Sequence, residues 1–159
     1  MEYFFSKFVL ETTDALGMKD VAAIRGARTV PDDAASPKTF DRVAEFIDGR
    51  QIDHVEFLHR RRGDFGAREL RGAILYDTSS SEPEPCLHVL NALLGYQGSG
   101  PLLSQSIMTH LGMSEGMFEE MNRSVNDIRS TNKSYAISAG NLGVDWLCDT
   151  SVPLILYKR

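Results

Sequence analysis

The chain has 159 residues, of which 42% are apolar, 25% charged and 9% aromatic, and this is the composition of an ordinary globular protein. Collagen-like, disordered and disulfide-scaffold proteins are excluded, and a single α+β domain over residues 1–159 is long enough to bury its own core. With 17 basic and 22 acidic residues the net charge is −5, which argues against a surface that coats nucleic acid or an anionic membrane as a whole.

The N-terminal residues 3–10 are rich in aromatic and β-branched side chains, which favours a buried strand. They lack the basic region and the cleavage site of a signal peptide, and no apolar run approaches the ~20 residues of a membrane-spanning helix. The two cysteines, Cys86 and Cys148, are far apart, as expected for free thiols in a reducing compartment. We therefore expect a cytoplasmic protein without a membrane interaction.

A helix is predicted at residues 37–48. Ser36 suits the N-cap, Pro37 suits the first helical position, and Gly49 suits the end of the helix. The apolar residues within it fall on one face. Two β-like runs at 52–60 and 68–77 flank a turn that contains Gly and Asp, and they predict an antiparallel hairpin over about 52–77.

Three more helices are predicted by apolar residues at helical spacing, at 86–94, 101–111 and 114–129. The Ser-, Glu- and Pro-rich stretch 78–85 before them predicts a flexible connector. Strands are expected at 134–139 and 152–157. The whole pattern indicates an α+β fold, in which a mainly antiparallel sheet is covered on one face by helices.

The loop at residues 95–101, Gly-Tyr-Gln-Gly-Ser-Gly-Pro, precedes a predicted helix. Backbone N–H groups at a helix N-terminus suit phosphate or carboxylate, so Gly98 and Gly100 are candidate anion-binding residues. The loop matches neither a P-loop nor a dinucleotide fingerprint, and Pro101 lacks an N–H group. The simpler interpretation is a tight connection between two helices.

Basic residues gather around the predicted hairpin turn, at His59, Arg60, Arg61 and Arg62. Residues 50–71 hold six arginines and four acidic residues, a local balance of +2, and the remaining 11 basic and 18 acidic residues leave −7. Arginine binds carboxylate and phosphate groups bidentately, and a basic ribbon can also enter a DNA groove. The alternative is a solvated turn whose charges oppose aggregation.

Acid–base chemistry has four candidate histidines, at positions 54, 59, 88 and 110. His54 and Glu56 are two residues apart on one predicted strand and should project from the same face. His88 and His110 flank the glycine-rich loop, and Ser99 within it is a candidate nucleophile, although no G-x-S-x-G motif is present. No metal-ligand cluster or cofactor motif is found.

The favoured hypothesis is a small non-enzymatic binding protein that uses the arginine hairpin to bind an acidic protein or a phosphate-bearing ligand. The alternative is a small enzyme with a pocket at the glycine-rich loop and a histidine base. Nucleic-acid binding through the hairpin is a third hypothesis, which the negative net charge disfavours.

Overall fold

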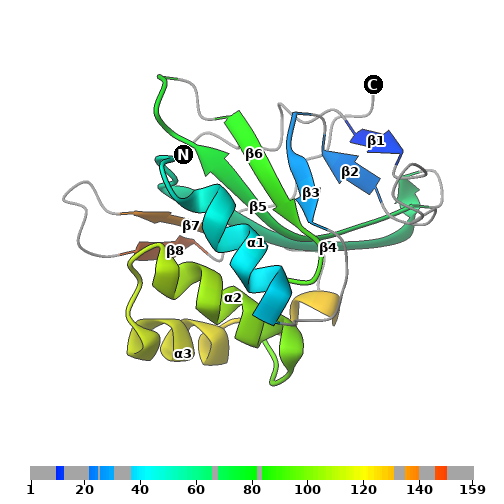
Figure 1. The fold of residues 1–159 in the computed structure, drawn as a ribbon. Coiled ribbons are helices and arrows are strands. Elements are labelled where there is room, and N and C mark those ends of the chain that lie inside the picture. The colour runs from blue at the N-terminus through cyan, green and yellow to red at the C-terminus, as the bar shows by residue number, and fades with distance from the viewer. Residues whose placement is uncertain are drawn as a thin grey trace.

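The computed structural model describes residues 10–12, 22–24, 26–30, 37–65, 68–81, 84–130, 135–139 and 146–149. Six strands form one sheet in the order β3-β6-β5-β4-β7-β8, and β1 and β2 form a separate pair (Figure 1). All neighbours are antiparallel except β3 and β6, which are parallel. The strands are β1 (Leu10–Thr12), β2 (Ala22–Ile24), β3 (Arg28–Val30), β4 (His54–Phe65), β5 (Arg68–Asp77), β6 (Glu84–Val89), β7 (Tyr135–Ala139) and β8 (Trp146–Asp149).

Three helices, α1 (Pro37–Ile47), α2 (Ser99–His110) and α3 (Glu115–Ser124), lie together on one face of the sheet (Figure 1). Alternate strand residues such as Val55, Phe57 and Leu75 point towards them, and these residues share one buried core with Val43 of α1, among others. The predicted α+β fold with a helical layer is therefore confirmed. None of the described helices is long and apolar enough to cross a membrane.

Local signals placed several elements correctly. Pro37 begins α1, and the Ser114 hydroxyl accepts a hydrogen bond from the backbone N–H of Met117 as the N-cap of α3. The strand β7 and the hairpin of β4 and β5 also form near their predicted positions, but β4 continues to Phe65 and so includes most of the stretch between 60 and 68 that was expected to be a turn. The predicted strand at 152–157 and nearly all of the one at 3–10 lie outside the described residues.

The predicted helix at 86–94 is wrong, because residues 84–89 form the strand β6 and a turn follows at 90–91. Leu87, His88 and Val89 are all fully buried, so this strand is covered on both faces. A strand of that kind shows no alternation of apolar and polar residues, and its apolar run also fits helical spacing. The connector predicted at 78–85 accordingly ends where β6 begins, at Glu84.

The helix predicted at 114–129 is also too long. Helix α3 ends at Ser124, and Val125 is extended, with φ −93° and ψ 147°. A 3₁₀ turn, η3 (Ile128–Ser130), follows, and the Asp127 carboxylate accepts a hydrogen bond from the backbone N–H of Arg129. Asp127 thus favours a new turn over continuation of the helix.

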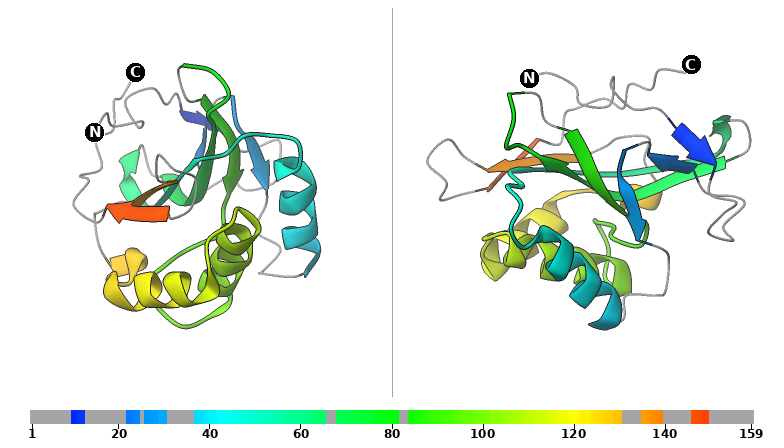
Figure 2. Two further views of the ribbon diagram at one scale, coloured as in Figure 1. Left: turned by 90° about the vertical axis from the view of Figure 1, so that its left-hand side faces the viewer. Right: turned by 45° about the horizontal axis from the view of Figure 1, so that its top comes forward.

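A second buried layer lies on the face of the sheet away from the helices, and the sequence did not predict it. Leu58, Leu70, Ile74 and Tyr76 alternate with the core residues of β4 and β5, and each is at most 1% exposed. Strand β2 lies against β5 and β6, and its Ile24 is 1% exposed (Figure 2). The central strands are therefore buried on both faces.

Candidate functional site

The glycine-rich loop is held by α3 and η3. The backbone N–H of Gly95 donates to Asn122 Oδ1 at 2.7 Å, and Asn122 Nδ2 donates to the carbonyl of Tyr96 at 3.1 Å. The backbone N–H of Ile128 donates to the carbonyl of Leu94 at 3.1 Å. The oxygen and the nitrogen of the Asn122 amide thus both hold the loop in place. A loop fixed in this way loses little conformational entropy when it binds a ligand.

A groove of about 640 Å³ opens beside this loop, between α2 and α3. Phe118 is 2% exposed in its lining, whereas Leu102 on α2 is 62% exposed and is the one large hydrophobic residue so exposed in the described part of the chain. The lining combines apolar and polar side chains. The lining consists of Gly95, Tyr96, Gln97, Gly98, Pro101, Leu102, Gln105, Phe118, Glu119, Asn122 and Arg123.

Tyr96 connects the groove to a charged cluster. The guanidinium of Arg129 lies 3.5 Å from the centroid of the Tyr96 ring, a cation–π contact. Arg129 also donates two hydrogen bonds to Asp127, from Nε to Oδ1 at 3.0 Å and from a terminal nitrogen to Oδ2 at 2.8 Å. These bonds lower the pKa of Asp127, whereas burial raises the pKa of Tyr96.

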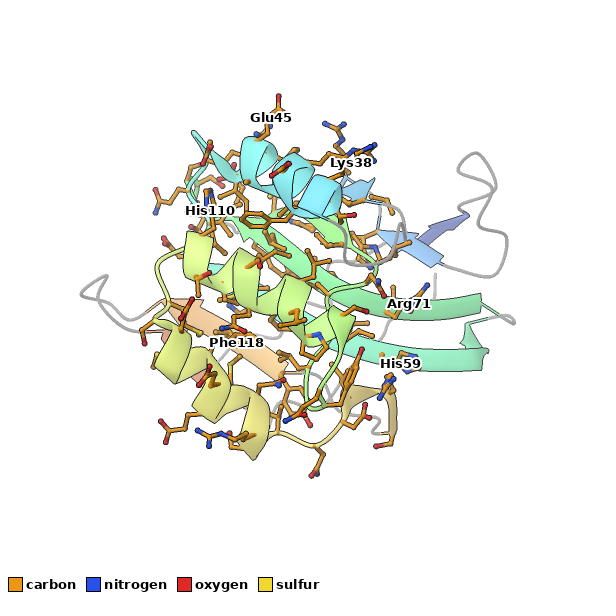
Figure 3. All side chains as sticks on the ribbon, turned by 60° about the horizontal axis from the view of Figure 1, so that its bottom comes forward. Lys38, Glu45, His59, Arg71, His110 and Phe118 are labelled. Carbon is orange, nitrogen blue, oxygen red and sulfur yellow. The ribbon has the colours of Figure 1, made fainter. Side chains whose placement is uncertain are left out.

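The middle of the β4–β5 hairpin, at His59 and Arg71, lies near this cluster. His59 and Arg71 are opposite one another on the two strands (Figure 3), and β4 packs against η3. After the hydrogen bonds from Arg129, the charge of His59 is a smaller influence that lowers the pKa of Asp127. The charge of Arg71 likewise lowers the pKa of Tyr96, against the larger rise that burial causes. Because β4 also packs against η3, and η3 holds the glycine-rich loop, the hairpin and the loop are near one another in the fold.

The predicted binding residues fall into two groups. His59, Gly98 and Gly100 surround the cluster, since the Tyr96 ring borders Gly98 and its hydroxyl borders Gly100. Arg60, Arg61 and Arg62 lie further along β4, where the hairpin extends past the helices (Figure 3). Their backbone course is described but their side chains are not.

None of the predicted catalytic candidates Ser99, His88 and His110 is among the lining residues of the groove, although Ser99 begins α2 directly after the lining residue Gly98. His110 contacts Asp48 Oδ1 through Nε2 at 2.9 Å, at the other end of α2. His88 is fully buried in β6, and its Nε2 lies 2.7 Å from the carbonyl oxygen of Arg71, so Nε2 carries the hydrogen. Burial lowers the pKa of His88 to about 4.

A second polar cluster is buried in the layer opposite the helices. Tyr76 donates its hydroxyl hydrogen to Glu56 Oε2 at 2.7 Å, and His54 Nε2 lies 3.1 Å from Glu56 Oε1. The expected projection of His54 and Glu56 from one face agrees with this contact. Tyr76 was missed because only the hairpin register, which pairs it with His54, brings it there. Burial and the Glu56 charge raise the pKa of Tyr76, so the phenol remains a hydrogen-bond donor.

Within the described ranges, no group of three or more His, Cys, Asp or Glu side chains is arranged to hold a metal ion. The half-buried Cys86 donates a weak hydrogen bond from Sγ to the carbonyl of Leu75 at 3.4 Å. Burial raises the pKa of this thiol to about 11.

Cys86 is therefore expected to react slowly with iodoacetamide. A rise of its pKa from 9 to about 11 makes the thiolate fraction at pH 8 about 100-fold smaller. Peptide mapping by mass spectrometry after timed alkylation measures the rate at this cysteine separately from Cys148. The same chain in urea is the control, and equal rates at Cys86 in the folded and unfolded chain would contradict the prediction.

No protein-family model, no curated protein and no solved structure matches this chain. Its function is therefore inferred from its own residues.

Proposed function

We propose that this protein is a non-enzymatic binding module that holds an acidic protein segment across the β4–β5 hairpin and the adjoining groove. The observation that carries the proposal is the packing of β4 against η3, whose Arg129 contacts the Tyr96 ring of the glycine-rich loop and donates hydrogen bonds to Asp127. The hairpin, with its basic sequence, therefore lies near an open groove that has both apolar and polar lining residues.

Charge favours an acidic partner. Residues 50–71 carry six of the 17 basic residues and a local balance of +2 in a chain of net charge −5. A basic region on an otherwise acidic molecule orients an acidic partner during encounter and repels one that approaches elsewhere. The free Cys86 thiol is in keeping with a cytoplasmic location.

The enzyme hypothesis has weaker support, since the groove-lining residues include neither His88 nor His110. A histidine base must lie within hydrogen-bond reach of the proton that it takes. His88 is fully buried in the sheet and His110 contacts Asp48 instead.

Replacing Arg60, Arg61 and Arg62 together by alanine is expected to weaken binding of an acidic peptide about tenfold. Solvent-accessible ion pairs typically contribute roughly 0.2–1 kcal/mol each, so the loss of three arginine–carboxylate pairs is compatible with tenfold, which corresponds to about 1.4 kcal/mol. The probe is a fluorescein-labelled 12-residue polyglutamate peptide, followed by anisotropy. Affinity of the wild-type chain should also fall as salt rises, because ions screen exposed charges.

The matched control replaces Arg28, Lys38 and Arg42 by alanine, which removes the same number of charges from β3 and α1. Figure 3 shows Lys38 on α1, away from the hairpin. Equal loss of affinity in both variants would mean that net charge alone acts, and the proposal would fail. Binding of inorganic polyphosphate through the three arginines without binding of polyglutamate would replace the acidic protein by a phosphate-bearing ligand.

A further inference from the structure

We infer that the acidic partner segment carries one bulky apolar side chain, which packs on Leu102 in the groove while its acidic residues extend towards the hairpin. This inference rests on the proposed function and specifies the partner more closely.

The first argument is the exposure of Leu102. Its neighbours in α2, Leu103 and Ile107, are 3% and 0% exposed and pack in the core, whereas Leu102 is 62% exposed. It lines the groove with Pro101 and Phe118, so it does not stand alone on a polar surface. Covering this leucine with an apolar side chain removes apolar surface from water, which makes the free energy of binding more favourable.

The second argument is the distribution of charge along this surface. On α3 the groove carries both Glu119 and Arg123, so this wall favours neither sign of partner charge. At the loop, Tyr96 belongs both to the groove and to the cluster that contains Arg129 and leads to Arg71 and the arginine hairpin. An apolar anchor therefore suits the groove, and carboxylates suit the adjoining hairpin. This order sets the orientation of the segment.

The experiment compares two labelled 12-residue peptides on the full chain. One is polyglutamate, and the other has a single leucine at its centre. Burial of leucine side chains predicts about tenfold tighter binding of the leucine-containing peptide to the wild-type chain. Leu102→Ser should remove this preference, so that the two peptides bind the variant with equal affinity. Glu120→Ser, an exposed position of α3 outside the groove lining, should keep the preference.

Each outcome decides a separate point. A preference that persists in Leu102→Ser, with circular dichroism showing a folded chain, overturns the inference and leaves the proposed function standing. If alanine at Arg60, Arg61 and Arg62 changes the binding of neither peptide, the proposed function fails. A second copy of the chain is the other possible occupant, because α3 exposes Glu115 and Glu120. A dimer in native mass spectrometry that Leu102→Ser abolishes would overturn the inference in favour of that occupant.

Discussion

Gly95→Ala is expected to destabilise the protein by about 3 kcal/mol, and the same change should damage the groove. Gly95 has φ +91°, a region that costs an alanine roughly 1–2 kcal/mol. An added Cβ would also collide with the backbone carbonyl of Asn126 and lie 2.7 Å from Cα of Asp127. Backbone atoms cannot rotate away, so the chain must shift, which typically costs a further 1–3 kcal/mol.

Urea denaturation followed by circular dichroism gives the free energy of unfolding. Gly112→Ala is the matched control, because Gly112 has φ +104° but an added Cβ would meet no atom within 4 Å. That variant carries the conformational cost alone and should lose about 1–2 kcal/mol. If both variants lost the same free energy, the close approach of the loop to residues 126–127 would not be a source of stability.

Anisotropy with the leucine-containing peptide gives this prediction a functional readout. The shift required by Gly95→Ala displaces the loop relative to α3 and η3. The hydrogen bonds that Asn122 makes with Gly95 and Tyr96 should therefore be lost. Gly112 lies at the other end of α2 and is not among the lining residues. Folded Gly95→Ala should therefore bind the peptide more weakly than folded Gly112→Ala.

Elements whose signals are local could be predicted from the sequence. Pro37 and Ser114 act within the first turn of the helices α1 and α3. The hairpin between β4 and β5 depends on a short turn. The strand β6 could not be separated from a helix, because burial on its second face depends on the β1–β2 pair and on sheet order. Burial by these distant segments is a property of the tertiary structure, so a stretch of ten residues does not reveal it.

The candidate site shows the same division. His59, Gly98 and Gly100 were identified by residue type, yet what unites them is Asp127, Arg129 and Tyr96, which the sequence did not single out for this role. Arg129 lies 33 residues after Tyr96, and only the packing of η3 against the loop brings them together. A tyrosine inside a glycine-rich loop was the available signal, since a large ring there needs a partner to pack on.

Acidification is expected to lower the free energy of unfolding by about 2–3 kcal/mol between pH 7.5 and pH 4.5 through His88. The folded-state pKa of this histidine is about 4, below its ordinary value of 6.5, chiefly because burial disfavours the charged ring. Between these values the unfolded chain binds the proton and the folded chain does not, so stability falls as the pH falls from 6.5 towards 4. Each unit of difference corresponds to 1.36 kcal/mol.

The test is a series of urea titrations from pH 7.5 to pH 4.5 on the wild-type chain, His88→Leu and His110→Leu. His88→Leu loses the hydrogen bond to the Arg71 carbonyl and should be less stable at pH 7.5, but its curve should decline less steeply with acid. His110→Leu keeps His88 and should keep the steep decline. Parallel curves for the wild-type chain and His88→Leu would mean that the imidazole accepts its proton without unfolding. The second buried layer would then admit a charge that its apolar neighbours, Ile74 opposite His88 among them, should exclude.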